Sequence, residues 1–186
     1  MQQIILASSS PRRKELLEKA GIKFKVVGSK IKEYLDIKLE PHKLAEKLSL
    51  EKAKAVQNKF KDAIIISADT LVVCEGKIFG KPTDEKDAEK MLKYLSGKTH
   101  SIITGFTVIN AKTNKIITGS DETKVTMRKI SKEEMESYLK TEEPFDKAGA
   151  YAIQGLAKKF IEKVEGDLSN AIGLPIDTIL NDLKAI

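Results

Sequence analysis

Arginine is scarce in this chain and is concentrated at one point. Of the 33 basic residues nearly all are lysine, and the arginines are Arg12, Arg13 and Arg128. The first two follow the loop Ala7–Pro11, where a short apolar strand gives way to a helix that begins near Pro11. A guanidinium binds phosphate or carboxylate through two parallel N–H bonds, and a helix N-terminus adds unpaired N–H groups and a positive dipole end. The pattern predicts an anion site, most simply for phosphate; a solvated first helical turn with proline at a favoured position is the alternative.

Asp69 is the first candidate for acid–base chemistry. It ends the apolar run 63–68 and precedes Thr70 and a second apolar run, 71–73. A carboxylate at the end of a buried strand is costly unless it is paired, hydrogen-bonded or bound to metal, and sites in sheet proteins often lie at strand ends. We therefore expect Asp69 at a strand end, either as a reactive group or as a residue that only breaks the strand.

Two further residues stand in constrained surroundings. Lys81 lies between a glycine and a proline, which could aim its ammonium group; an ordinary exposed turn lysine is the alternative. Gln154 follows a short apolar segment bracketed by Gly149 and Gly155, where the backbone can approach a ligand closely and a neutral amide could read a base edge. A tight loop with a solvated glutamine is the alternative. Glu33 and Lys52 have no privileged interpretation from the residues alone.

Several chemistries are disfavoured by what the sequence lacks. It contains neither a GxxxxGK[ST] phosphate loop nor a GxGxxG fingerprint. His42 and His100 are the only histidines and Cys74 is the only cysteine, which disfavours histidine and cysteine metal clusters and a histidine-based triad. If a metal is used, carboxylates remain as its ligands, and these suit magnesium or manganese.

Composition indicates a globular protein. The chain has 186 residues, 41% of them hydrophobic and 32% charged, which is enough for one sizeable core. The lack of a long apolar run, of signal-peptide features and of paired cysteines favours the cytoplasm. The net charge of +6 could reflect an anionic ligand or simply a lysine-rich composition. Because acidic residues are interleaved with the basic ones and only 5% of residues are aromatic, a nucleic-acid binder is disfavoured.

Hydrophobic periodicity predicts a mixed sheet with helices, an α/β or α+β fold. Thr113 and Asn114 separate two long strands and predict an antiparallel hairpin, and Ser131 with Glu134 has the spacing of a helix capping box. Strands are expected at 4–7, 24–27, 63–73, 78–79, 101–111, 115–129 and 157–164. Helices are expected at 11–20, 41–60, 88–95, after 131 and from 175 onward.

Six short blocks in this order resemble one family, the Maf family of nucleoside triphosphate pyrophosphatases. Because the blocks run from the first residues to the last helix, the resemblance covers residues 1–186 as a single Maf-like domain with two lobes. The blocks are Ala7–Leu17, Ala68–Val73, Gly80–Thr83, Leu95–His100, Asp146–Gly155 and Gly173–Pro175.

This resemblance implies hydrolysis of a nucleoside triphosphate between its α and β phosphates, which gives a monophosphate and pyrophosphate. It also implies a divalent cation (Mg²⁺, Mn²⁺ or Co²⁺) and a fold like that of inosine triphosphate pyrophosphatase, with a twisted mixed sheet flanked by helices and a cleft between two lobes. The expected partner is the nucleotide, canonical or modified. Nucleic acid and membrane are not expected, and a homodimer is compatible with the resemblance.

The resemblance also assigns residue roles. It implies that Asp69 is the general base that activates water and that Glu33 is a metal ligand together with Asp69, although Ile31 stands where many relatives carry an acid. The implied phosphate-binding residues are Arg12, Arg13, Lys52 and Lys81.

The positions that sort subfamilies are Arg12, Thr70 and Gln154. Gln154 resembles the branch that acts on dTTP and UTP, whereas the branch that acts on 7-methyl-GTP usually has an acid there. A 7-methyl-GTP pyrophosphatase and a nucleotide-binding regulator of cell division without turnover remain the alternatives.

Overall fold

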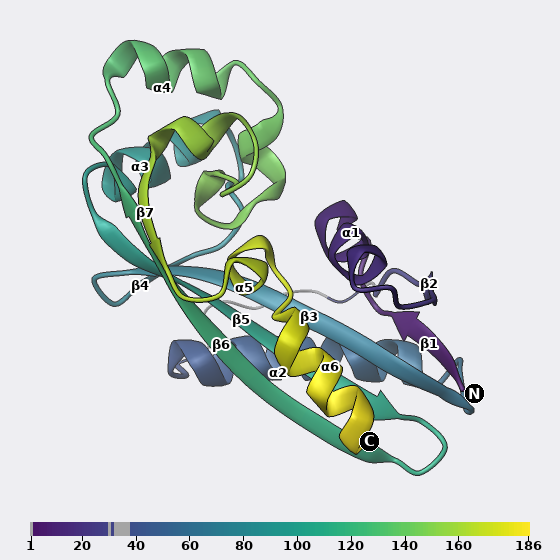
Figure 1. The fold of residues 1–186 in the computed structure, drawn as a ribbon. Coiled ribbons are helices and arrows are strands. Elements are labelled where there is room, and N and C mark those ends of the chain that lie inside the picture. The colour runs from purple at the N-terminus through teal and green to yellow at the C-terminus, as the bar shows by residue number, and fades with distance from the viewer. Residues whose placement is uncertain (1, 30, 32–37) are drawn as a thin grey trace. The chain divides into compact units, whose positions relative to one another are not determined.

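The computed structural model describes residues 2–29, 31 and 38–186. The described residues form a seven-stranded sheet in the order β2-β1-β3-β5-β6-β7, with β4 paired to β3 (Figure 1). Strand β1 is parallel to β2 and β3, whereas β4 is antiparallel to β3 and β7 to β6. The predicted mixed sheet is therefore confirmed. The strands are β1 Gln3–Leu6, β2 Phe24–Val26, β3 Ala63–Cys74, β4 Lys77–Phe79, β5 Thr99–Asn110, β6 Lys115–Met127 and β7 Ile161–Glu165.

The helices begin at residues that favour a helix start. Helices α1 and α2 open with proline, and Asp84 accepts a hydrogen bond from the backbone N–H of Asp87 at the start of α3. The predicted capping box of Ser131 and Glu134 is present at the start of α4. The α-helices are α1 Pro11–Lys19, α2 Pro41–Gln57, α3 Glu85–Leu95, α4 Lys132–Leu139, α5 Leu168–Ile172 and α6 Ile176–Ala185. Three 3₁₀ helices are η1 Glu143–Asp146, η2 Ala148–Ala150 and η3 Leu156–Phe160.

The predicted hairpin is present, whereas the strand predicted at 157–164 begins later than expected. Residues 111–114 join the neighbouring strands β5 and β6, and because so short a connection can join only antiparallel strands, the predicted hairpin is confirmed. The strand predicted at 157–164 is wrong in its first half. Residues 156–160 form η3, and β7 begins only at Ile161. Gly155, with φ of 133°, turns the chain just before η3, a conformation that the apolar pattern does not reveal.

The chain divides into two compact units. Unit 1 comprises Met1–Thr70, Thr104–Asp121 and Gly173–Ile186, and unit 2 comprises Leu71–Ile103 and Glu122–Ile172. Strands β3, β5 and β6 contribute residues to both units.

Unit 1 has a core on each face of its strands, because successive strand residues point to opposite faces. Ile65 packs on the face covered by α2, and the next residue, Ile66, packs on the face covered by α1 and α6. Each fully buried Leu or Ile side chain contributes about 1.5–3 kcal/mol. The face of α2 holds Ile5, Ala7, Ala53, Val56, Ala63, Ile65 and Ile109. The face of α1 and α6 holds Leu6, Leu17, Ile66, Ala68, Phe106, Val108, Leu174 and Ile179.

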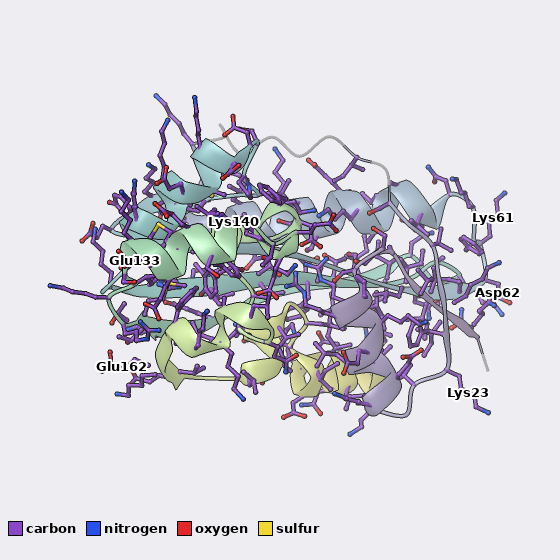
Figure 2. The ribbon with its side chains drawn as sticks, turned by 90° about the horizontal axis from the view of Figure 1, so that it is seen from above. Lys23, Lys61, Asp62, Glu133, Lys140 and Glu162 are labelled. Carbon is purple, nitrogen blue, oxygen red and sulfur yellow. The ribbon has the colours of Figure 1, made fainter. Side chains whose placement is uncertain are left out.

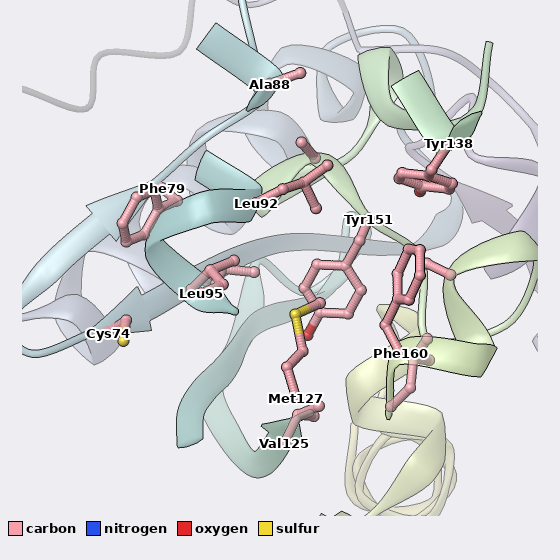
Figure 3. Close-up of a cluster of buried hydrophobic side chains, with 14 of the residues drawn as sticks. Cys74, Phe79, Ala88, Leu92, Leu95, Val125, Met127, Tyr138, Tyr151 and Phe160 are labelled. Carbon is pink, nitrogen blue, oxygen red and sulfur yellow. The ribbon is translucent and has the colours of Figure 1, made fainter. Parts of the chain in front are cut away.

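Unit 2 has a core of its own, which Figure 3 shows in close-up. Helices α3 and α4 and the 3₁₀ helices pack their apolar side chains onto the ends of β3, β5 and β6 that belong to this unit. The rings of Tyr138 and Phe160 meet edge to face with centroids 5.5 Å apart, and His100 meets Tyr151 in the same manner at 5.5 Å. Such edge-to-face contacts fix ring orientation as well as burying area.

Charged side chains lie on the outside of both units. Figure 2 shows Lys23, Lys61 and Asp62 of unit 1 and Glu162 of unit 2 at the periphery of the view, and all four are exposed. Both signs are thus interspersed on the surface. Among the residues that the structure describes, no helix has the length and apolar composition needed to span a membrane.

The burial of His100 predicts a pH dependence of stability. Desolvation lowers the pKa of His100 from 6.5 to about 4 in the folded protein. The unfolded chain therefore binds a proton first as pH falls, so the free energy of unfolding should drop between about pH 6.5 and pH 4, by up to ~3 kcal/mol. Urea unfolding of wild type and His100→Gln at pH 7 and pH 4.5 measures this loss.

The variant should lose less stability than wild type over this range. An equal loss of unfolding free energy between pH 7 and pH 4.5 in wild type and His100→Gln would show that His100 does not control this pH dependence.

Candidate functional site

Asp69 lies in the middle of β3, so the prediction that residues 71–73 extend the strand is confirmed and the prediction that Asp69 marks a strand end is wrong. Strand β3 runs without interruption from Ala63 to Cys74, and Asp69 is 5% exposed. The apolar residues on either side of it continue the strand, because a strand buried on both faces reads as a near-continuous apolar run. A carboxylate in such a place needs a partner of opposite charge or several hydrogen-bond donors.

Lys52 supplies that partner. It lies on α2 with Ser49, Ala53 and Val56, on the face of the helix that packs against the strands of unit 1, and it is 8% exposed. Its Nζ donates to Oδ1 of Asp69 in a short ion pair. Two residues before Asp69 on the same strand, the hydroxyl of Ser67 donates to the carbonyl of Ser49 at 2.6 Å. Helix α2 is thus tied to β3 by a hydrogen bond and an ion pair.

Arg13 joins three further segments of unit 1. Its Nε donates to the carbonyl of Gly173 at 2.7 Å, Nη1 to the hydroxyl of Ser8 at 3.2 Å, and Nη2 to the hydroxyl of Thr70 at 3.0 Å. The hydroxyls of Thr70 and Thr104 in turn lie 3.0 Å apart. The guanidinium therefore connects the loop before α1, strand β3 and the loop before α6. A planar group with several donors in fixed directions suits such a junction, and lysine could not replace it.

Arg12 differs from its neighbour. It lies half-buried in the first turn of α1 and forms no hydrogen bond or ion pair with another described residue. Ser10, the N-cap residue, accepts no hydrogen bond from the helix through its side chain. The start of α1 thus presents a guanidinium and backbone N–H groups together, which is the combination that binds anions.

The structure brings together part of the predicted set. Lys52 pairs with Asp69 and Arg13 with Thr70, the next residue of β3, so both pairs meet the same strand in unit 1, and Arg12 precedes Arg13 on α1. Two predicted residues, Lys81 and Gln154, belong to unit 2 and are exposed. The predicted metal ligand Glu33 lies outside the described residues. The roles assigned to all of these residues stay predictions.

Sequence reasoning missed three participants. Ser8 carried a signal, because it belongs to the serine run before the arginines, but nothing singled it out from the two serines that follow it. The carbonyl of Gly173 and the hydroxyl of Thr104 carried none. Residues of unit 1 that are 34 or more positions apart meet here only because β3 and β5 are neighbours and the chain returns after α5.

Asp69 offers hard carboxylate oxygen to a divalent cation. Within the described part of the chain no group of three or more His, Cys, Asp or Glu side chains could hold a metal ion. Magnesium, however, is commonly held by one or two carboxylates with phosphate oxygens of the substrate and water. The residues present therefore fit a cation that is bound jointly with an anionic substrate. A buried carboxylate paired with lysine can hold a cation, take a proton or orient water.

Two solved structures of HAM1 proteins have the same fold. The chain is similar to a HAM1 protein from Coxiella burnetii, with a TM-score of 0.59 and 13% identity over 100% of both chains. It is similar to the Ham1 protein of Staphylococcus aureus, with a TM-score of 0.51 and 13% identity over 99% of both chains. At this identity the likeness concerns the fold, and it confirms the predicted fold class.

Much closer similarity is found in curated sequences. A dTTP/UTP pyrophosphatase of Alkaliphilus oremlandii is 49% identical over 95% of this chain and 92% of its own length. Proteins with the same name from Thermoanaerobacter sp. and Bacillus cereus are 45% and 44% identical over 98% and 99% of this chain, and each is covered over 95% of its length. The model of the Maf-like protein family matches residues 3–186. The chain belongs to the Maf family.

Proposed function

We propose that this protein is a nucleoside triphosphate pyrophosphatase that hydrolyses dTTP and UTP to the monophosphate and pyrophosphate. The buried ion pair of Lys52 and Asp69 carries the proposal, because it places a charged carboxylate where folding alone does not need one. Full-length relatives named for this activity support the substrate class. Canonical and modified pyrimidine nucleotides present the same base edge and are both candidates.

Asp69 acts as general base in this proposal. The attacking water bonds to phosphorus, its proton passes to the carboxylate of Asp69, and the bond between the α and β phosphates breaks as pyrophosphate leaves. Lys52 fixes the direction of the carboxylate through Oδ1. A triphosphate carries roughly four negative charges, and phosphate hydrolysis requires them to be neutralised while water is aimed in line. Arginine and lysine side chains provide part of that neutralisation.

A divalent cation is part of the same proposal. Asp69 and, outside the described residues, Glu33 would hold it together with the phosphates. When bound, the cation neutralises charge that develops on the phosphate oxygens. Lys81 and Gln154 complete the proposed substrate-binding residues, the first for phosphate and the second for the base.

The two arginines of α1 have different tasks in this account. Arg13 is already committed to Ser8, Thr70 and the carbonyl of Gly173, so it holds the site in shape. Arg12, without a hydrogen bond to a described residue, is the guanidinium that meets the substrate. The hydrogen bonds of Arg13 support this division, whereas the family match does not bear on it.

Asp69→Asn should lower the turnover number for UTP by about 10²–10⁴, because it removes the base and retains the shape. The measurement is pyrophosphate release by the purified, folded variant. Asp62→Asn, an exposed acid just before β3, is the matched control and should keep wild-type turnover. Near wild-type hydrolysis by Asp69→Asn would exclude Asp69 as the base.

Arg12→Lys should raise KM for UTP by about tenfold, because one bidentate phosphate contact is lost, while the melting temperature stays unchanged. Arg13→Lys should lower the melting temperature and the turnover number together, because an ammonium cannot reach three divergent acceptors. Steady-state kinetics and thermal melts of both variants test the division. Identical effects of the two substitutions would refute it.

Removal of divalent cations should abolish activity, and Mg²⁺, Mn²⁺ or Co²⁺ should restore it. The reason is that the lysine and arginine side chains neutralise only part of the charge of the triphosphate, and a cation held by Asp69 would supply the rest. Activity after exhaustive chelation and after each readdition is the measurement. Full activity in the chelated enzyme would overturn the metal requirement.

A further inference from the structure

The loop that carries Gln154 is fixed on both sides. On its upstream side Tyr151, Ala152 and Ile153 are buried in the core of unit 2. On its downstream side the chain turns at Gly155 and enters η3. Gln154 itself is exposed, and its amide forms no hydrogen bond with another described residue. A side chain of this kind is held in position by its backbone, so the residues that hold the backbone decide where the amide points.

Glu143 is the downstream anchor. Its Oε2 accepts a hydrogen bond from the backbone N–H of Leu156 at 2.9 Å, and its Oε1 accepts one from the N–H of Ala157 at 3.2 Å. The hydroxyl of Tyr138 donates to the same Oε1 at 3.0 Å. One carboxylate thus satisfies the first two N–H groups after Gly155, which have no partner within the 3₁₀ helix that they begin.

The anchor is itself held in place. Lys147 donates its Nζ to the carbonyl of Glu143 at 3.0 Å. The ring of Tyr138 is buried against Phe160 (Figure 3), so its hydroxyl has a fixed position. Burial, and then the charge of Glu143, raises the pKa of Tyr138 far above its ordinary value, so the phenol remains a hydrogen-bond donor.

The fit between Glu143 and the loop is close. A Cβ at Gly155 would lie 2.5 Å from Oε2 of Glu143, and the residue has φ of 133°, where side chains are strained. Glycine is therefore required at the turn, and the carboxylate fills the space that a side chain would take. Glu143 is separated from Gln154 by eleven positions in the sequence, and none of the roles assigned above includes it.

We propose that Glu143 is a positioning residue for base selection, whose carboxylate holds the loop that presents Gln154 to the nucleotide. This inference rests on the proposed function, because it assumes that Gln154 reads the base. The amide of Gln154 can donate to a carbonyl and accept from the ring N–H of uracil or thymine, whereas cytosine offers an amino group and a bare ring nitrogen. The ratio of kcat/KM for UTP to that for CTP therefore measures how well the amide is placed.

Glu143→Gln tests the inference, since the amide retains the size of the carboxylate but its NH₂ cannot accept from the loop N–H. We expect the UTP to CTP ratio to fall about tenfold, with KM for UTP rising more than kcat falls. Glu142→Gln, the exposed neighbouring acid, is the matched control and should retain the wild-type ratio and melting temperature. Tyr138→Phe removes one hydrogen bond and retains the ring, so it should shift the ratio in the same direction by about threefold, and it carries the test if Glu143→Gln does not fold.

The double variant Glu143→Gln, Gln154→Ala separates positioning from general damage. If Glu143 acts through Gln154, adding Glu143→Gln to Gln154→Ala should change the UTP to CTP ratio by less than about twofold. An unchanged ratio in the single variant, or an equal fall in both backgrounds, would overturn the inference. Failure of the proposed function would appear elsewhere, as a wild-type protein that does not hydrolyse UTP.

Discussion

The buried ion pair between Lys52 and Asp69 is the constraint on which the architecture of unit 1 depends. Two charges removed from water cost several kcal/mol each, and their attraction compensates only when the geometry is held. Helix α2 and strand β3 hold it, with the apolar contacts of Ala53 and Val56 on one element and Ile65 on the other. Loss of either partner would leave a buried charge at a cost of about 3–5 kcal/mol. Apolar residues of similar volume could fill the same space without that risk, so stability alone does not require the pair.

A second set of hydrogen bonds joins distant segments of unit 1 at Thr70, the residue after Asp69. Thr70 follows Asp69 on β3 and receives Arg13, which reaches Ser8 and the carbonyl of Gly173 as well. Lys52 of α2 therefore orients the carboxylate, and Arg13 ties the start of α1 to the next residue of the same strand. In unit 2 the same principle recurs on a smaller scale, where Glu143 fixes a loop through backbone N–H groups. In both places one charged side chain positions several backbone or hydroxyl groups, so a single residue keeps the local structure rigid.

Much of the fold was predictable because local patterns and packing agree. The hairpin of β5 and β6, the capping box at Ser131 and the helix after Pro175 follow from turn, cap and periodicity signals. Asp69 was recognised as a candidate but placed at a strand end, because a polar residue between two apolar runs resembles one; its pairing with Lys52, which spacing does not reveal, compensates its charge within the buried strand. The start of β7 was misplaced because Gly155 and Glu143 together impose a 3₁₀ turn on an apolar segment. The hydrogen bonds of Arg13 depend on the order of the strands in the sheet, so the spacing of residues in the sequence could not predict them.

The most direct measurement is a product-resolved comparison of dTTP, UTP and 7-methyl-GTP with the purified wild-type protein. The account predicts that dTTP and UTP are converted to equal amounts of monophosphate and pyrophosphate, with no diphosphate released. It also predicts a kcat/KM for 7-methyl-GTP at least about tenfold lower, because the neutral amide of Gln154 matches the pyrimidine edge. A preference for 7-methyl-GTP, or nucleotide binding without turnover, would contradict the account.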